Sequence, residues 1–508
     1  MTDSDLVAEL AKRLVGIAII SSDINDGDLN GKDMEALIGK ITVFFENAEK
    51  PAILTREGLL LLEGAKDTKN EITVEIAAPL DFRPLAKETE ENFMIRSVHG
   101  QKTDGTVADF TRHFSDRLEQ VKSMIQSGLN NNTVGMLQGI EDMKRFTVGR
   151  EIVIAGMVYE KSITKNGHIL VTVEDETGRV KVLFAKPSRE VTNSAAATLF
   201  SSAYKIINDE VIAVRGKVSG TDFIIAKSLM YPGVPVHQRK KIDEDISIGF
   251  LSDIHVGSKL FMQKQFDRFT EWMNGKFKYR SDYAGRIKYV VVSGDLVDGI
   301  GVYPNQDREL AIDDIYLQYK KLFEMLGKIP EYVHIFLLTG NHDAVQRAEP
   351  QPELPSEFCK DFMLENMHLV SNPGYMTLHG MRILGYHGTS LDSVIQGIPG
   401  CSYSRPEEAM VEVLKRRHLS PIYGDNPIVP SKRDEMVIDQ VPDILHMGHL
   451  HKNGYSEYHG TLIVNSGTWQ SRTSYQVRLG HMPTPAVLPV YEAGRMELGT
   501  VDFNNVFE

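Results

Sequence analysis

The sequence predicts a multidomain chain with a small N-terminal helical domain, an all-β barrel, and an α/β domain in which a sheet is flanked by helices. Apolar residues recur at helical spacing in the first part, short alternating runs fill the middle, and strand-like apolar runs alternate with helical stretches in the rest. A length of 508 residues also exceeds that of one domain. The predicted parts are a helical domain at 1–64, a linker at 65–105, a helical lead-in at 106–140, a barrel domain at 141–240 and an α/β domain at 241–508.

Composition narrows the class of protein. The chain is 42% hydrophobic and 25% charged, which is typical of globular domains. It has 2 cysteines and no CxxC pair, so neither a disulfide framework nor a structural zinc site is expected. The apolar run 15–20 is too short for a signal core or a membrane span. We therefore expect a soluble protein of the reducing cytoplasm.

The N-terminal part shows helical periodicity. A capping candidate at Ser4 precedes apolar residues at helical spacing, and 34–45 and 54–62 follow the same pattern. These apolar stripes indicate a core more than a partner surface. Residues 65–105 are polar and interrupted by prolines, which predicts a linker with little fold of its own. Residues 107–126 then predict one amphipathic helix.

The middle of the chain predicts an OB-fold barrel. It contains five strand-like runs, with a helix-tolerant segment between the third and the fourth, which is the element order of that barrel. The strand–acidic turn–strand at 174–184 resembles nucleic-acid-binding OB domains of replication proteins. A formal net charge of −13 argues against binding nucleic acid by bulk charge, but this region is mildly basic. Ordinary fluctuation of charge remains an alternative, as does a barrel used only as a protein platform, because the stacking candidates are few: Tyr159, Phe184 and Phe223.

Five polar clusters organise the α/β domain. Each follows an apolar run that predicts a buried strand, the run before the last cluster being weaker. The clusters are Ser252-Asp253-Ile254-His255, Gly294-Asp295-Leu296-Val297-Asp298-Gly299, Gly340-Asn341-His342-Asp343, Gly385-Tyr386-His387-Gly388 and Gly448-His449-Leu450-His451. Because strand ends of an open α/β sheet share one edge, where ligands bind, we expect these side chains to meet.

The residue types predict a two-metal phosphodiesterase site. Two divalent ions about 3.5–4 Å apart would offset the charge of a phosphodiester and supply hydroxide near neutral pH. Carboxylates, amide oxygens and imidazoles suit such ions. The predicted metal ligands are Asp253, His255, Asp295, Asn341, His387, His449 and His451. Asp295 is assigned the bridging role, and His342 is assigned to the scissile phosphate, where it stabilises developing charge or protonates the leaving oxygen. Asp343 is expected to orient His342 or the turn.

No single cluster is specific, but their order is. An isolated Asp-x-His is more often a capping carboxylate beside a satisfied histidine. All five clusters in this order resemble the calcineurin-like metallophosphoesterases, which implies a metallophosphoesterase sandwich. Three stretches narrow the resemblance, namely 299–306, 340–355 and 465–472. Together they resemble the small subunit of the archaeal family D DNA polymerases, over roughly 105–508. For the N-terminal part, the resemblance extends only to the kind of structure, a group of helices, and not to sequence motifs.

That resemblance implies a 3′–5′ exonuclease acting on DNA 3′ ends for proofreading and releasing nucleoside monophosphates, like the double-strand-break repair nucleases. It implies manganese as the usual metal, with Mg²⁺, Fe²⁺ or Zn²⁺ as alternatives, and a large subunit that holds the polymerase site. It also implies that the seven ligands named above bind the metal ions and that His342 is the catalytic imidazole. The related eukaryotic accessory subunits have lost these ligands. A nucleoid-associated cytoplasmic location is implied.

Other functions remain open at the level of the sequence. The chain could be a non-catalytic scaffold of the polymerase, or a metallophosphatase for phosphomonoesters. No clamp-binding motif is evident, because Gln318 has Lys321 where an aliphatic residue belongs, so contact with a sliding clamp is expected only through the complex. No triphosphate-binding loop of Walker type is found either.

Overall fold

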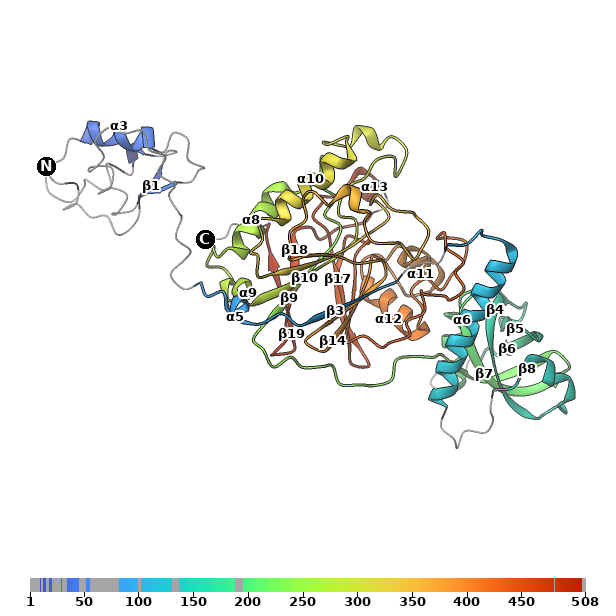
Figure 1. Cartoon of the computed structure of the whole chain (residues 1–508). Helices are drawn as coiled ribbons and strands as arrows, with labels where there is room; N and C mark the ends of the chain where they lie inside the picture. Colours follow the sequence, from blue (N-terminus) through green and yellow to red (C-terminus); the bar gives the residue numbers. More distant parts are fainter. Residues whose placement is uncertain are drawn as a thin grey trace. The chain divides into compact units, whose positions relative to one another are not determined.

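The computed structural model describes residues 82–98, 102–129, 137–187, 195–478 and 480–504, together with 10, 12–14, 18–20, 29, 34–44 and 52–54 nearer the N-terminus. Contacts divide the chain into two compact units, Met1–Ile76 and Ala77–Glu508 (Figure 1). No helix among these residues is both long and apolar enough to cross a membrane.

The N-terminal unit contains a helix and a strand pair. Helix α3 (Met34–Phe44) confirms the helix predicted there. Strand β1 (Ala18–Ile20) pairs in parallel with β2 (Ala52–Leu54), so the region predicted as helical also contains a short strand pair. Both strands are three-residue apolar runs, and short apolar runs do not distinguish strand from helix by periodicity. The helix predicted at 54–62 lies outside the described residues apart from its first position, which ends β2.

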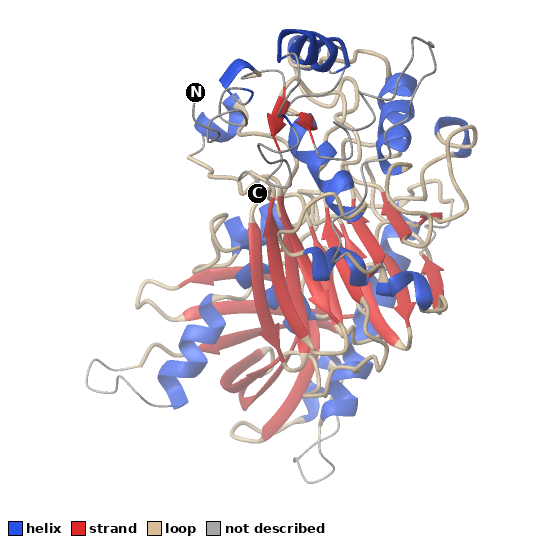
Figure 2. Ribbon diagram, turned by 90° about the vertical axis from the view of Figure 1, so that its left-hand side faces the viewer, coloured by secondary structure: helices blue, strands red, loops and turns tan. Residues whose placement is uncertain are grey.

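The second unit contains two six-stranded sheets (Figure 2). The first has the strand order β12 (Met367–Leu369), β11 (His334–Leu338), β10 (Ile287–Ser293), β9 (Ser247–Leu251), β18 (Val487–Glu492) and β19 (Glu497–Asp502). The second has the order β16 (Asn453–Tyr458), β17 (Thr461–Ser466), β15 (Ile444–Met447), β14 (Met381–Tyr386), β13 (Gly374–Leu378) and β3 (Phe93–Ser97).

The two sheets face each other, and helices cover their outer faces. One apolar core, with Phe250, Phe336 and Ile383 among its members, lies between the sheets. A second core packs the first sheet against α8 (Gln263–Met273), α9 (Ser281–Arg286) and α10 (Ile315–Leu326). A third core packs the second sheet against α11 (Leu391–Gly397) and α12 (Pro406–Arg416). The prediction of an α/β domain flanked by helices is confirmed, with two sheets in place of one.

Strand β3 corrects the predicted linker at 65–105. It pairs antiparallel with β13, from Ser97 opposite Gly374 to Phe93 opposite Leu378, and a helical turn, α5 (Leu85–Glu88), precedes it. The ring of Phe93 packs edge-on against Phe336, with 5.3 Å between centroids. β3 lies at the edge of its sheet and is only partly buried, so its sequence lacks the continuous apolar run that marks a central strand.

The barrel is confirmed with all its predicted elements. Strands β4 (Glu151–Ile163), β5 (Ile169–Asp175), β6 (Gly178–Phe184), β7 (Val211–Gly220) and β8 (Phe223–Met230) close in the order β4-β5-β6-β8-β7. Helix α7 (Ala195–Tyr204) lies between the third and fourth strands, as an OB-like barrel requires. The predicted amphipathic helix is α6 (Val107–Gly128), which begins at a capping box formed by Thr106 and Asp109. Short 3-10 turns occur at Ile140–Arg145, Gln306–Arg308 and Ser356–Phe358, and a last short helix, α13, spans Ser474–Arg478.

Candidate metal centre

All five predicted clusters lie at the carboxyl ends of strands. β9, β10 and β11 are mutually parallel, and β14 and β15 are parallel in the facing sheet. The ends of these five strands carry, in order, Asp253 with His255, Asp295, Asn341 with His342, His387, and His449 with His451. Two facing sheets therefore deliver their polar strand ends to one region, as the sequence predicted.

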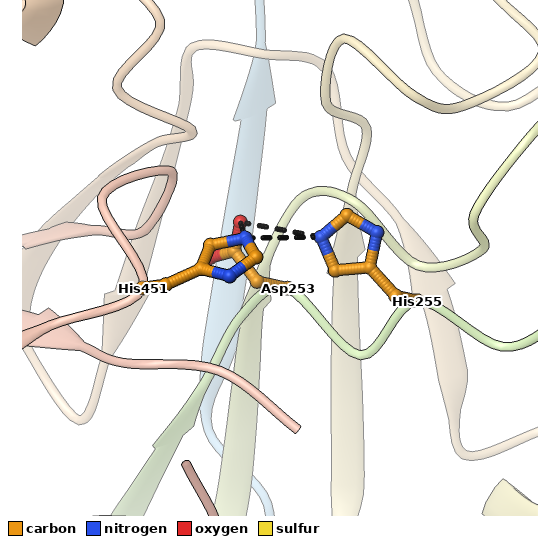
Figure 3. A group of neighbouring side chains, drawn as sticks. All are labelled: Asp253, His255 and His451. Carbon is orange, nitrogen blue, oxygen red and sulfur yellow. Dashed lines mark hydrogen bonds and ion pairs between the residues drawn. The ribbon is translucent and has the colours of Figure 1, made fainter. Parts of the chain in front are cut away.

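Asp253, His255 and His451 form the first group whose ligand atoms converge (Figure 3). Nε2 of His451 lies 3.4 Å from Oδ1 of Asp253, and Nε2 of His255 lies 4.0 Å from the same oxygen. The two Nε2 atoms are 3.1 Å apart. Oδ1 of Asp253 is buried and has no hydrogen-bond partner among the described residues. A buried carboxylate oxygen facing two imidazole nitrogens is a donor set that fits a divalent cation.

Asp295 joins this first group to a second. Its Oδ2 lies 3.3 Å from Nε2 of His387 and 3.7 Å from Nε2 of His255. Nε2 of His387 also lies 2.9 Å from Oδ1 of Asn341. Asp253, Asp295 and His387 together form another convergent group. This position between two sets of donors is what the bridging role assigned to Asp295 requires.

Hydrogen bonds fix which ring nitrogen faces the centre. Nδ1 of His255 lies 3.1 Å from Oδ1 of Asp298, and Nδ1 of His387 lies 2.9 Å from the carbonyl oxygen of Ser293. Both acceptors hold the proton on Nδ1, so Nε2 is the nitrogen that would bind a cation after losing its own proton. His449 is held the other way, with Nε2 3.0 Å from Oδ2 of Asp392, so Nδ1 is its remaining ligand atom.

His449 lies beside the convergent groups found in the described part of the chain, without belonging to one. Its ring is 5.1 Å from that of His387, measured between centroids. Its backbone N–H donates to Oδ2 of Asp253 over 2.9 Å. The assignment of His449 as a metal ligand therefore stays a prediction that depends on its Nδ1.

His342 is placed at the border of the centre. Its backbone N–H donates to Oδ1 of Asp295, and its Nε2 lies 4.0 Å from Oδ2 of that residue. Nδ1 donates to the carbonyl oxygen of Asp298 over 2.7 Å. The side chain of His342 is 16% exposed, against 0% for His387. Burial lowers the pKa of His342, which keeps the ring neutral at pH 7.

Asp343 stabilises the turns that carry its neighbours. Its Oδ2 accepts from the backbone N–H groups of Gly340 and Leu296, and Oδ1 accepts from the Tyr319 hydroxyl. Of its two predicted roles, this geometry matches orientation of the turn. Burial and the nearby charge of Asp295 raise the pKa of Asp343 to about 7.

The motif glycines permit close approach of the carboxylates. A Cβ atom at Gly340 would lie 2.3 Å from Oδ1 of Asp295, and one at Gly448 would lie 2.4 Å from Oδ2 of Asp253. Any side chain at either position would displace a carboxylate.

The non-glycine residues with positive φ include Asp253, His255, Asp295, His449 and His451. Such strained backbone is concentrated at functional sites.

The pocket strongly favours positive charge. Burial opposes ionisation of Asp295, yet the charge of His387 and its hydrogen bond hold the pKa of Asp295 well below the usual range. Burial also disfavours a charged His387, but Asp295 and Asp253 raise its pKa to about 10. For His255, the hydrogen bond to Asp298 and the charge of Asp295 outweigh burial and raise the pKa to about 8. A cation in this pocket would balance the same carboxylates.

Several residues that support the centre were not assigned from the sequence. Asp298 orients His255 through its carboxylate and His342 through its carbonyl, and it lies within the second polar cluster. Gln470 donates to Asp298 over 3.1 Å, and Gln476 lies 2.9 Å from Nδ1 of His451. Asp298 could have been found from its position three residues after Asp295. Asp392 precedes His449 by 57 residues, and no local signal connects them.

The candidate stacking aromatics of the barrel differ in exposure. Phe184 is fully buried in the barrel core, so it cannot stack on a base and that candidate is wrong. Tyr159 is 49% exposed, and the guanidinium of Arg179 lies 3.7 Å from its ring centroid. Phe223 is half-buried at the start of β8.

The fold and the site define an α/β protein with a candidate two-metal centre and an OB-like barrel. The family of the B subunits of DNA polymerases alpha and epsilon matches residues 248–454. The chain is 35% identical over 459 residues to the DNA polymerase II small subunit of Methanothermobacter thermautotrophicus, covering 89% of this chain and 90% of that protein. It is 38% identical over 431 residues to that of Archaeoglobus fulgidus, covering 82% and 83%. A solved archaeal phosphodiesterase matches at 12% identity, with a TM-score of 0.25, over 50% of this chain and 99% of that one.

The chain belongs to the archaeal DNA polymerase II small-subunit family, the small subunits of the family D DNA polymerases. The resemblance drawn from the motifs is thereby confirmed.

Proposed function

We propose that this subunit is a metallophosphoesterase that removes nucleotides from DNA 3′ ends as the 3′–5′ exonuclease of a family D polymerase. The observation that carries the proposal is the convergence of Asp253, His255, Asp295, His387 and His451 at the strand ends, with Asn341 beside them. Oδ1 of Asp253 is buried without a hydrogen bond, which costs folding free energy that a scaffold would have no reason to spend.

The residues divide the chemistry among themselves. Asp253, His255 and His451 would hold one cation, His387, Asn341 and His449 a second, and Asp295 would contact both. When bound, two divalent cations of this kind, most often Mn²⁺, supply Lewis acidity and a nucleophile near neutral pH. His342 is neutral in the unliganded protein, but an anionic phosphate beside Nε2 favours its protonated form. His342 can then stabilise the phosphate or protonate the leaving oxygen.

The partners follow from the family. We infer a large catalytic subunit that carries the polymerase site, with this chain supplying the nuclease and any clamp contact made through the complex. In the OB-like barrel the guanidinium of Arg179 stacks on the ring of Tyr159. An aromatic ring beside a cationic group suits the barrel to holding a single strand near the polymerase. Polymerisation itself belongs to the large subunit.

A metallophosphatase is the second candidate, since the same donor set would serve phosphomonoesters. An OB-like barrel and membership of a replicative polymerase family favour DNA as the substrate.

The test is an exonuclease assay on 3′-labelled primer–template DNA with the full chain, alone and with its large subunit, during a Mn²⁺ titration. We expect release of nucleoside monophosphates, and no activity above background for His342→Ala. Because His342 is not among the predicted metal ligands, the variant should bind Mn²⁺ and the large subunit as the wild type does. Wild-type protein that degrades no 3′ end in either form rules out the nuclease. Hydrolysis of a small phosphomonoester without action on DNA would favour the phosphatase.

A further inference from the structure

Tyr303 lies next to His342, on the loop that follows the polar cluster at 294–299. The centroids of the two rings are 6.1 Å apart, and the ring planes meet at 59°. Tyr303 is 37% exposed. Tyr303 has no role in the mechanism proposed above, and it is not one of the proposed metal ligands.

Hydrogen bonds fix the Tyr303 hydroxyl and the loop on which it lies. The hydroxyl of Tyr303 donates to Oε2 of Glu309 over 2.9 Å. The backbone N–H of the neighbouring Val302 donates to Oε1 of Gln306 over 2.9 Å. Gln306 in turn donates to the carbonyl oxygen of Asp298, which also accepts from His342. The loop that carries the ring and the catalytic imidazole are therefore fixed to the same residue.

The hydroxyl is unsuited to proton transfer with substrate. It is engaged by Glu309, a carboxylate that also lies 3.3 Å from Oγ of Ser474. Burial and the charge of Asp298 raise the pKa of Tyr303, so the phenol stays neutral. What remains available to a ligand is the aromatic ring.

We propose that Tyr303 binds the base of the 3′-terminal nucleotide by stacking. The inference rests on the proposed nuclease function. In 3′–5′ cleavage only the terminal sugar separates the terminal base from the scissile phosphate. The ring of Tyr303 is likewise a direct neighbour of His342, which we assign to that phosphate. Every base offers an aromatic face, so a tyrosine platform accepts all four, as an exonuclease needs. Ring faces held rigid before binding also lose little entropy.

Substitution of Tyr303 by alanine should lower kcat/KM for base-bearing 3′ ends by about tenfold or more, the usual strength of base–aromatic stacking. Tyr303→Phe keeps the ring and should retain most of the wild-type activity. Tyr279→Ala is a matched control, because Tyr279 is 44% exposed but follows the far end of α8, away from the strand ends that carry the site.

The deciding substrate is an oligonucleotide whose 3′-terminal nucleotide is abasic. Wild type should lose about the same factor on this substrate as Tyr303→Ala loses on normal ends, and the variant should match wild type on the abasic end. If Tyr303→Ala were slower than wild type by the same factor on both substrates, Tyr303 would only support the loop, and the inference would fail. Wild-type kinetics of Tyr303→Ala on normal ends would also overturn it. Wild-type protein inactive on every 3′ end would instead remove the proposed nuclease function, and the inference with it.

Discussion

Two buried clusters in this molecule both combine aspartate with histidine, but the carboxylates are balanced by different cationic groups. At the strand ends, Asp253 and Asp295 face histidine nitrogens. Around Asp434, the carboxylate Oδ2 accepts from Nε of Arg117 over 2.6 Å and lies 2.9 Å from Nε2 of His418. Arg117 lies on α6, so the second cluster joins that helix to the α/β domain.

The difference is where the balancing positive charge comes from. Asp434 has a permanent guanidinium beside it, and burial together with the charge of Arg117 lowers the pKa of His418 to about 4. In the candidate metal centre the carboxylates pair with imidazoles, and the pKa of His387 is raised to about 10. Aspartate and histidine together therefore do not identify a metal site. The informative combination is a set of carboxylates balanced by imidazoles in place of arginine or lysine, with ligand nitrogens facing one another.

The largest expected effect comes from removing the charge that both groups of donors share. Asp295→Asn should reduce exonuclease activity by about 10³-fold or more, because a divalent metal supplies several kcal/mol of transition-state stabilisation. A second readout is independent of activity. In wild type, Mn²⁺ at 100 times its Kd should stabilise the fold by about 2.7 kcal/mol in urea unfolding, and this increment should be lost in the variant. An unchanged increment would contradict the bridging role.

The second cluster should behave in the reverse manner. Asp434→Asn leaves Arg117 buried without its carboxylate, which should lower the free energy of unfolding by about 3–5 kcal/mol. The increment from Mn²⁺ should remain as in wild type. Asp439→Asn is the control, because Asp439 pairs with the half-exposed Arg96 and should cost only about 1 kcal/mol or less. A loss of Mn²⁺ stabilisation in Asp434→Asn would erase the distinction between the clusters.

The candidate centre was predictable because its signal is local. Each ligand cluster directly follows an apolar run, and the ends of parallel strands share an edge whichever order the strands take. The distribution of strands between two sheets was not predictable, since an apolar run does not say which neighbour it pairs with. β3 is the clearest case, because Met94 pairs with Thr377, far along the chain, and only tertiary packing connects them.

The supporting residues were harder to predict than the ligands. Asp298 acts on His342 through its backbone carbonyl, and any residue type could supply that atom. The Asp434 cluster brings together side chains from α6 and from two segments of the C-terminal half, with no spacing that marks it. The N-terminal strands β1 and β2 are three residues each, too short for their period to show.

The smallest expected effect is a difference in the sign of the pH dependence. The pKa of His418 is about 4 in the folded protein, so between about pH 6.5 and pH 4 the unfolded chain binds more protons and stability falls as pH falls. The pKa of His255 is raised to about 8, so in metal-free protein its contribution is present below about pH 6.5 and is lost as pH rises through 8.

Replacing His418 by glutamine separates the acid limb of the stability profile, below about pH 6.5, from the alkaline limb above it. His418→Gln keeps an N–H donor for Asp434 but cannot titrate. Its free energy of unfolding, measured with urea in EDTA, should therefore fall less than that of wild type from pH 6.5 to 4, by at most about 3 kcal/mol. Above pH 6.5 the two proteins should lose stability in parallel, because His255 and His387 are unchanged. Fluorescence of the buried Trp272 and Trp469 reports the unfolding. Equal acid limbs in the two proteins would mean that the Asp434 cluster does not hold His418 neutral, and the contrast with the metal centre would then rest on Arg117 alone.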